Sequence, residues 1–395
     1  MTTSTLTHTT LLRSVFAGLL FALAACGGGV EVGGTGAGAY VQGPISGFGS
    51  VIVSGVRFDD SRASIEDPDG VVRRREDLRL GMLVQIESGP IGDDGSGGRA
   101  ATATRVRLAS ELLGPLSLVD LANARLVVLG QPVRLTAATV VDGGAGGAAS
   151  LQVGNVVEVH GFFALDEGYV ATRVERRATP PASYRVRGLV RDLDPIATTL
   201  RIGSQGFDLS ATGVPSGLAN GQFVRLTLRT EQQVGGRWPV AAVVIETPSA
   251  GDRDEAEVEG LISAFTSPAV FSVNGVRVDA AAATFVDGSG GLRVGVRVKV
   301  RGRSQAGVLV AATVDIRSDA DAFSEGVDIR DAIGMVDTAA QTFTLRGISV
   351  FYGSSPSFVN GTAANLVPTQ RVRVRGNLST DRTRVIATRI EFVNN

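Results

Sequence analysis

The chain repeats itself at intervals of just over 70 residues. A glycine followed two residues later by an aliphatic residue recurs at separations of 71, 74, 72 and 74 residues. The five occurrences are Gly43/Ile45, Gly114/Leu116, Gly188/Val190, Gly260/Ile262 and Gly334/Val336. A period of this length is typical of a chain that is built from repeated supersecondary units, so the repeat limits the fold more than any single motif does.

Further anchors keep their order inside the intervals and predict short strands joined by tight turns. Hairpin turns recur at Ser54-Gly55, Leu129-Gly130, Asn274-Gly275 and Arg346-Gly347, whereas the third interval is irregular near Gly203 to Gly206. A later anchor falls at Gly81, Gly154, Gly221, Gly295 and Thr369, and each copy is followed by apolar residues that alternate with polar ones. This alternation with a period of two predicts a strand with one buried face and one solvated face.

The pattern predicts an all-β chain of five small modules, each with five or six strands that close into a barrel and hide their edges. OB-like and SH3-like closures both fit the sequence. The expected modules span residues 40–109, 110–178, 183–247, 255–318 and 323–395. Modules of this size are near the lower limit for independent stability, so we expect neighbouring modules to dock against each other.

Residues 1–25 read as a processing segment. Arg13 precedes the short apolar stretch Val15 to Leu23, as in a secretory signal peptide. The segment Leu23-Ala24-Ala25-Cys26 resembles a bacterial lipobox, which implies cleavage before Cys26 and transfer of a lipid to its thiol. Acyl chains would then anchor the protein to a membrane. Because Cys26 is the only cysteine, the mature protein is expected to have neither a disulfide nor a thiol nucleophile.

A glycine-rich tether is expected after the anchor, so residues 26–39 combine the lipidated cysteine with a flexible spacer. Seven of the thirteen residues from 27 to 39 are glycine. By resemblance to proteobacterial sorting, Gly27 after the cysteine favours the outer membrane over the inner one. The sequence does not choose between the periplasmic and the surface face.

Two hairpin motifs carry a resemblance to a known family. The first runs from Gly47 to Phe58, and the second is Val-Asn-Gly-Val-Arg-Val from Val273 to Val278. Together with the lipobox and the tether, they resemble the bacterial envelope family called domain of unknown function 5666. The resemblance is closest in the first and fourth modules and weakest in the third. It implies tandem small β-modules on a surface or periplasmic lipoprotein, and it implies no catalytic residues.

The sequence contains no complete catalytic or metal-binding motif. His160, the one histidine after the processing segment, occupies an outward strand position, so a solvated surface histidine is expected. Asp67-Pro68-Asp69-Gly70, Asp93-Asp94-Gly95 and Asp192-Leu193-Asp194 resemble fragments of calcium loops, but tight turns explain them more simply. We therefore expect no metal, no cofactor and no catalytic residue.

The outward side chains that follow the later anchor change from acidic to basic along the chain. The basic ones are Arg297, Lys299, Arg301, Arg371, Arg373 and Arg375. If the last two modules stack in register, these residues form a stripe that suits an anionic glycan, a lipid headgroup or an acidic partner. Strand charges that maintain solubility and protect edges are the simpler explanation. Nucleic acid is not expected, because aromatic residues make up only 5% of a chain with a net charge of -1.

Three hypotheses about function follow. The first is a non-enzymatic, lipid-anchored envelope protein whose modules form a binding or spacing array for an anionic glycan or an envelope protein. The second is an assembly factor or accessory subunit for one envelope partner. The third and weakest is a carboxylate-based hydrolase. The sequence leaves the oligomeric state open.

Overall fold

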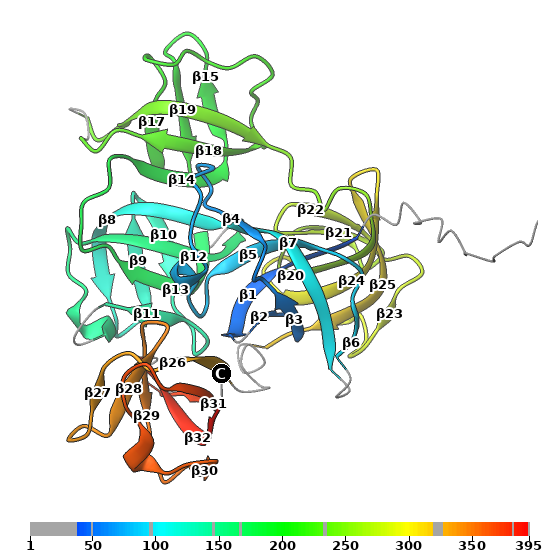
Figure 1. Ribbon diagram of the computed structural model, residues 1–395. Helices are drawn as coiled ribbons and strands as arrows, with labels where there is room; N and C mark the ends of the chain where they lie inside the picture. The colour runs from blue at the N-terminus through cyan, green and yellow to red at the C-terminus, as the bar shows by residue number, and fades with distance from the viewer. Residues whose placement is uncertain are drawn as a thin grey trace, which may run out of the picture. The chain divides into compact units, whose positions relative to one another are not determined.

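The computed structural model describes residues 38–48, 50–94, 98–143, 147–165, 168–231, 235–318, 327–380 and 383–393. Within these ranges the chain is all-β, and its strands close into small five-stranded barrels (Figure 1). Helical structure in the described residues is limited to the 3-10 turns η1 (Arg75–Asp77), η2 (Gly147–Ser150) and η4 (Ala363–Asn365).

Residues 39–108 show how one barrel closes. Its main strands are β1 (Ala39–Phe48), β2 (Val51–Val53), β3 (Val56–Asp59), β5 (Leu83–Ser88) and β7 (Arg99–Leu108). β1 pairs antiparallel with both β2 and β5, β2 pairs with β3, β3 runs parallel to β7, and β7 pairs with β5 to close the ring. The short strands β4 (Ser64–Glu66) and β6 (Gly92–Asp93) also pair with β7.

The same order of pairing is found in later segments of the chain. Residues 110–176 contain β8 (Ser110–Asp120), β9 (Arg125–Val128), β10 (Gln131–Arg134), β11 (Val140–Asp142), β12 (Val156–Ala164) and β13 (Gly168–Arg176). Residues 253–316 contain β20 (Arg253–Ser267), β21 (Val270–Val273), β22 (Val276–Asp279), β23 (Thr284–Phe285), β24 (Arg297–Gln305) and β25 (Val308–Ile316).

In two further segments, a break divides the first strand of the barrel into two shorter strands. Residues 184–246 contain β14 (Tyr184–Leu189), β15 (Arg191–Asp194), β16 (Thr199–Ile202), β17 (Gln205–Asp208), β18 (Phe223–Leu228) and β19 (Trp238–Glu246). Residues 327–392 contain β26 (Val327–Ala332), β27 (Val336–Asp337), β28 (Thr342–Leu345), β29 (Ile348–Phe351), β30 (Ser357–Val359), β31 (Arg371–Leu378) and β32 (Arg384–Phe392).

The hairpin that the sequence leaves irregular in the third interval is formed after all. β16 and β17 pair antiparallel around a two-residue turn at Gly203 and Ser204, with Ile202 opposite Gln205. The other hairpins have positive φ at both turn residues, as at Asn274 and Gly275, whereas here Gly203 at the first position has it. Turns with glycine first also match the twist of paired strands. The expectation of irregularity was wrong because this turn uses a different residue order.

The later anchor is a position of positive φ in every interval. Gly295 has φ +84°, and its N–H donates to the carbonyl oxygen of Ile262. Thr369 takes the same role, with φ +71° and a hydrogen bond to the carbonyl oxygen of Ile333. A β-branched residue rarely adopts this conformation, so the surrounding pairing holds Thr369 in place.

The barrels are joined by backbone pairing and by shared cores. β1 runs parallel to β20 at Ala39–Gln42 and parallel to β26 at Gly47–Phe48, and β8 pairs with β14. One continuous hydrophobic core contains residues from both 41–108 and 327–392, and another spans 112–240. The predicted docking of modules is therefore present, but it also links strands that lie more than 200 residues apart.

Candidate functional site

The basic residues of β24 are less exposed than the sequence predicts. Arg297 is only 8% exposed, donates to Glu259 at 2.6 Å, and places its guanidinium 5.2 Å from the ring centre of Phe162. The solvent exposure predicted for Arg297 was therefore wrong, because Phe162 of a neighbouring barrel covers it. Burial lowers the pKa of Lys299, whose side chain is half-buried.

The basic residues of β31 gather around one carboxylate. Arg373 donates to Asp328 at 2.9 and 2.6 Å, and Arg57 from β3 donates to the same carboxylate at 3.0 Å. Arg375 lies 3.5 Å from it, whereas Arg371 is exposed. Burial alone would raise the pKa of Asp328, but these hydrogen bonds hold it below its usual value.

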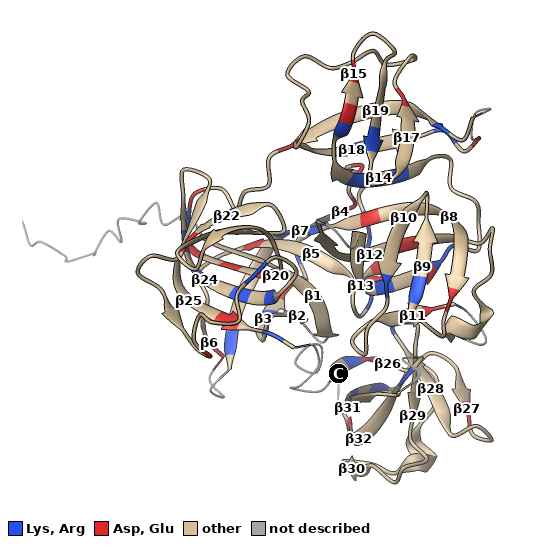
Figure 2. Ribbon diagram, turned by 180° about the vertical axis from the view of Figure 1, so that it is seen from behind, with Lys and Arg blue, Asp and Glu red and all other residues tan. Residues whose placement is uncertain are grey.

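The two groups of basic residues do not form one stripe. β24 pairs with β20 and β25, and β31 pairs with β26 and β32. Figure 2 marks these basic residues in blue. β20 and β26 each pair with β1 instead of with each other, so the last two barrels are not stacked in register. The condition on which the predicted stripe depends is not met.

Arg301 belongs to a different arrangement that the sequence reasoning missed. Glu257 on β20 is 2% exposed, and its Oε2 lies 2.8 Å from Arg301 Nε and 2.9 Å from Arg99 Nη1. A cavity of about 460 Å³ opens beside these three residues. We call these three residues the Glu257 clamp. Glu257 lies opposite Arg301 in the pairing of β20 with β24, so a strand register predicted from the sequence would reveal this contact but not the one with Arg99. The Glu257 carboxylate already binds both guanidinium groups, so an added anion would have to displace it.

His160 lies inside the protein. It is 1% exposed, and neither ring nitrogen has a hydrogen-bond partner among the described residues. Burial lowers its pKa to about 4, so the imidazole is neutral at pH 7. The expectation of a solvated histidine was wrong, because residues of the first ring such as Arg79 and Met82 lie over the outward face of β12.

The acidic turn motifs are explained by local hydrogen bonds. Asp67 Oδ1 accepts N–H groups from Asp69 and Val71 at 2.9 Å each, and Asp194 Oδ1 accepts those of Ile196 and Ala197 at the same distance. These are Asx-type turns. In the part of the chain that the structure describes, no three His, Cys, Asp or Glu side chains are grouped so that they could hold a metal ion.

The predicted membrane anchor falls outside the described residues. The predictions that fall there are those for Cys26, for the signal peptide at 1–25 and for all but the last two residues of the 26–39 segment. Within the described ranges, no helix has the length and apolar character that crossing a membrane requires.

A comparison with protein families supports the repetition of the barrels, which are also called rings below. The family model described as Domain of unknown function (DUF5666) matches residues 114–175, 259–315 and 333–391. The chain carries tandem copies of DUF5666. The resemblance seen at Val273 to Val278 is thereby confirmed, whereas the DUF5666 match does not include the motif at Gly47 to Phe58. A comparison with curated proteins found no match.

The three matched DUF5666 copies share a backbone feature. Each has a register shift at a glycine in the strand after the later anchor, at Gly161, Gly302 and Gly376. A Cβ at these positions would lie 2.4, 2.0 and 2.1 Å from a carbonyl oxygen of the facing strand. In the rings that the DUF5666 model leaves out, the shift falls at Ser88 and Leu228. The bulge glycine therefore separates the matched rings from the others.

Proposed function

We propose that the chain is a non-enzymatic, lipid-anchored envelope protein whose barrels form one joined scaffold for binding an envelope component. The observation that carries the proposal is the pairing of β1 with both β20 and β26. In a linear spacer each repeat contacts only its neighbours in the chain. The first ring contacts two rings that are distant from it in sequence, and this favours a joined scaffold with a binding function over a linear spacer. The lipobox at Cys26 supports the anchored location, with the outer membrane favoured by Gly27.

We further propose that the described chain contains five copies of one OB-like module, two of which have diverged from the family pattern. The strand order is first, second, third, fifth, fourth and back to first, with the third strand parallel to the fifth. This order matches an OB-like barrel better than an SH3-like one. It supports OB-like closure for all five rings.

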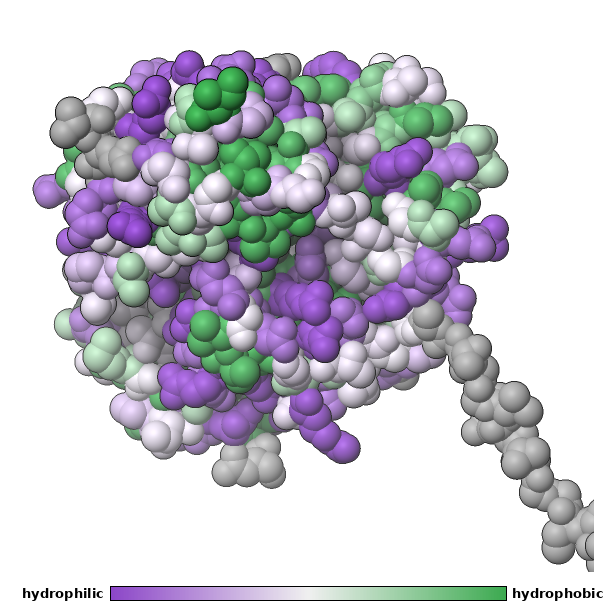
Figure 3. Space-filling model, turned by 90° about the horizontal axis from the view of Figure 1, so that it is seen from above, coloured by the Kyte–Doolittle hydropathy of each residue, from purple (hydrophilic) through white to green (hydrophobic). Residues whose placement is uncertain are grey.

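The cavities favour individual binding sites over a repeated one. Cavities of about 450, 460 and 320 Å³ each have linings from more than one ring, and these linings do not correspond between copies. The face in Figure 3 shows hydrophobic side chains in several separate groups, the largest over its upper middle, with hydrophilic side chains between them. Exposed apolar residues such as Val72, Ile196 and Met335 come from separate segments. A polar partner, such as an anionic glycan or a charged envelope protein, suits such a surface.

The test uses the full chain in intact cells. Metabolic palmitate labelling should be lost in Cys26→Ser, while an exposed control substitution, Thr388→Ser, should keep the label. Crosslinking followed by mass spectrometry should then recover the same envelope component from wild type and Thr388→Ser. Labelling that persists without Cys26 would contradict the anchor. The absence of any reproducible crosslinked component would contradict the binding role.

A further inference from the structure

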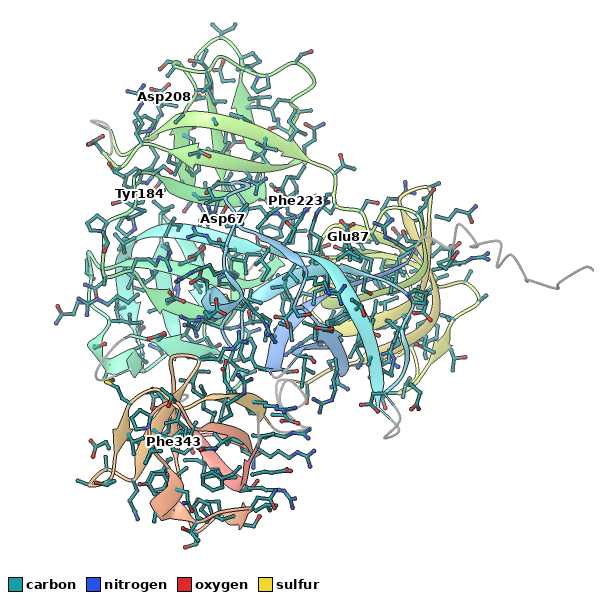
Figure 4. The ribbon with its side chains drawn as sticks, viewed as in Figure 1. Asp67, Glu87, Tyr184, Asp208, Phe223 and Phe343 are labelled. Atoms are coloured by element: carbon teal, nitrogen blue, oxygen red, sulfur yellow. The ribbon has the colours of Figure 1, made fainter. Side chains whose placement is uncertain are left out.

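The outer face of the last ring (residues 327–392) carries a concentration of arginine side chains. Strands β26, β31 and β32 pair in that order, and their inward positions hold core residues such as Val374. Figure 4 labels Phe343, which belongs to the same core and is 1% exposed. Where all three strands are paired, the outward charged residues are the arginines Arg330, Arg371, Arg373, Arg375 and Arg389 and the carboxylates Asp328 and Glu391. We call this surface the basic face.

Several guanidinium groups of the basic face are open to solvent. The side chains of Arg375 and Arg389 are 52% and 46% exposed, and Arg330 and Arg371 are exposed as well. Among the described residues, Arg330 and Arg371 form no ion pair, whereas the other arginines of the face each have a carboxylate partner. The face therefore offers two cations that have no anion of the chain to neutralise them.

Like charges lie directly opposite each other on this face. The two pairs of arginines that face each other across the strands are Arg330 with Arg373 and Arg375 with Arg389. Like charges at such positions destabilise a sheet. The fold does not require them, because the fourth ring has Glu259 opposite Lys299 at the position of the first pair. A bound anion would offset the repulsion.

The basic face already binds one carboxylate of the chain itself. Asp328 accepts hydrogen bonds from Arg373 at 2.9 and 2.6 Å and from Arg57 at 3.0 Å, and it lies 3.5 Å from Arg375. The planar guanidinium group matches the geometry of a carboxylate. Side chains two residues apart on one strand are about 7 Å apart, so a ligand with carboxylates at intervals could contact several arginines at once.

The basic face lacks the apolar side chains that other kinds of partner use. The exposed large hydrophobic residues of the described chain all lie outside β26, β31 and β32. A protein interface usually has an apolar or aromatic centre, and a surface that lies on a membrane inserts apolar side chains into it. A hydrophilic chain with repeated negative charges needs neither, and an acidic polysaccharide is such a chain.

We propose that the basic face binds a polysaccharide chain that carries carboxylate groups, with Arg330, Arg371 and Arg375 in contact with them. The proposal rests on the binding role proposed above, to which it assigns a surface and a ligand class.

The test is calorimetric titration of the purified full-length chain with polygalacturonate, with the neutral polymer dextran as the control. We expect polygalacturonate to bind and dextran to give no heat. The affinity should fall as NaCl is raised from about 20 mM to about 300 mM, because salt screens exposed charges. Absence of polygalacturonate binding, or binding that salt does not weaken, would overturn the proposal.

Variants locate the site. The double variant Arg330→Gln/Arg371→Gln should bind polygalacturonate about tenfold more weakly, since two charge-assisted contacts are lost. The control Arg125→Gln/Arg277→Gln removes two exposed arginines from the second and fourth rings and should leave the affinity unchanged. Glu391→Gln removes a carboxylate from the basic face and should raise the affinity about twofold, a gain that a folding defect cannot produce.

Equal affinities of the two double variants, or no gain in Glu391→Gln, would contradict the proposal. Phosphatidylglycerol vesicles represent the competing kind of surface. If the loss in Arg330→Gln/Arg371→Gln appears with these vesicles and not with polygalacturonate, the face binds lipid headgroups and the proposal is wrong.

This proposal and the binding role in the envelope can fail separately. A crosslinked envelope component without polygalacturonate binding would remove only the polysaccharide ligand. Polygalacturonate binding that depends on the basic face, without a crosslinked component, would remove only the partner in intact cells.

Discussion

At the scale of single residues, several charges that are buried in this protein are paired with opposite charges. Arg173 is 1% exposed and donates to Asp142 at 2.7 Å and to Glu175 at 2.9 Å. Burial would raise the pKa of Glu175, but Arg173 and Arg177 lower it to about 2. Each of these charges would be costly to bury alone. His160 lies near these pairs as a neutral group with no hydrogen-bond partner in the described part of the chain, and its lowered pKa makes stability sensitive to pH.

We predict that His160 makes stability depend on pH between about 4 and 6.5. Its pKa is lowered from 6.5 to about 4, chiefly by burial, so the unfolded chain binds a proton in this window while the folded chain does not. Stability contributed by the neutral form is therefore complete above pH 6.5 and is lost as the pH falls towards 4, by on the order of 3 kcal/mol. The charged groups around it are Glu158, Glu175, Arg173 and Arg185.

The measurement is urea unfolding of wild type and His160→Gln at about pH 7 and about pH 4.5. Wild type should lose roughly 2 kcal/mol more than the variant over this range. Carboxylates titrate in both proteins, so the difference isolates the histidine. Equal losses in the two proteins would show that His160 is not buried in its neutral form.

At the scale of elements, the sequence predicted the strands well and their surroundings poorly. The hairpin at Asn274-Gly275 and the alternation in β31 are local properties, and both were found where expected. Periodicity tells which face of a strand a residue is on, but not what covers that face. The exposure of Arg297 and His160 was mispredicted for this reason, since Phe162 of another ring covers the first and residues of the first ring lie over the second. The Glu257 clamp needs Arg99 from a distant ring, which no local pattern reveals.

The bulge glycines give a prediction at this scale. We expect Gly302→Ala to lower the free energy of unfolding by more than about 2 kcal/mol, because the added Cβ would lie 2.0 Å from the carbonyl oxygen of Val310 and the strand would have to move. Gly290 in the same ring is the control, since nothing lies within 4 Å of a Cβ there. Gly290→Ala should change stability by less than about 0.5 kcal/mol in chemical denaturation. Similar losses for both variants would mean that the bulge tolerates a side chain.

At the scale of the whole molecule, the contacts between rings that are distant in sequence determine whether the rings stay together. Besides the β1 pairing, Ser54 donates to Glu259 at 3.1 Å, Arg99 to Glu257 at 2.9 Å and Arg57 to Asp328 at 3.0 Å. Glu257 and Glu259 are both buried. These charge-assisted contacts are buried or partly buried and add to the backbone pairing around them, so we expect the joined rings to separate with difficulty.

A cut in the connection before β20 tests this directly. We predict that a protease site inserted after the exposed Gly251 can be cleaved while the two halves stay together, because β1 pairs with β20 at Ala39–Gln42 and with β26 at Gly47–Phe48. The cleaved protein should elute in size-exclusion chromatography at the volume of the uncut chain and separate only in denaturant. A matched variant that also carries Arg57→Gln and Arg99→Gln should release the halves at a lower urea concentration, since both ion pairs cross the joint. Halves that separate in buffer alone would show that the rings are held by the chain and not by one another, and the scaffold would then be a flexible array.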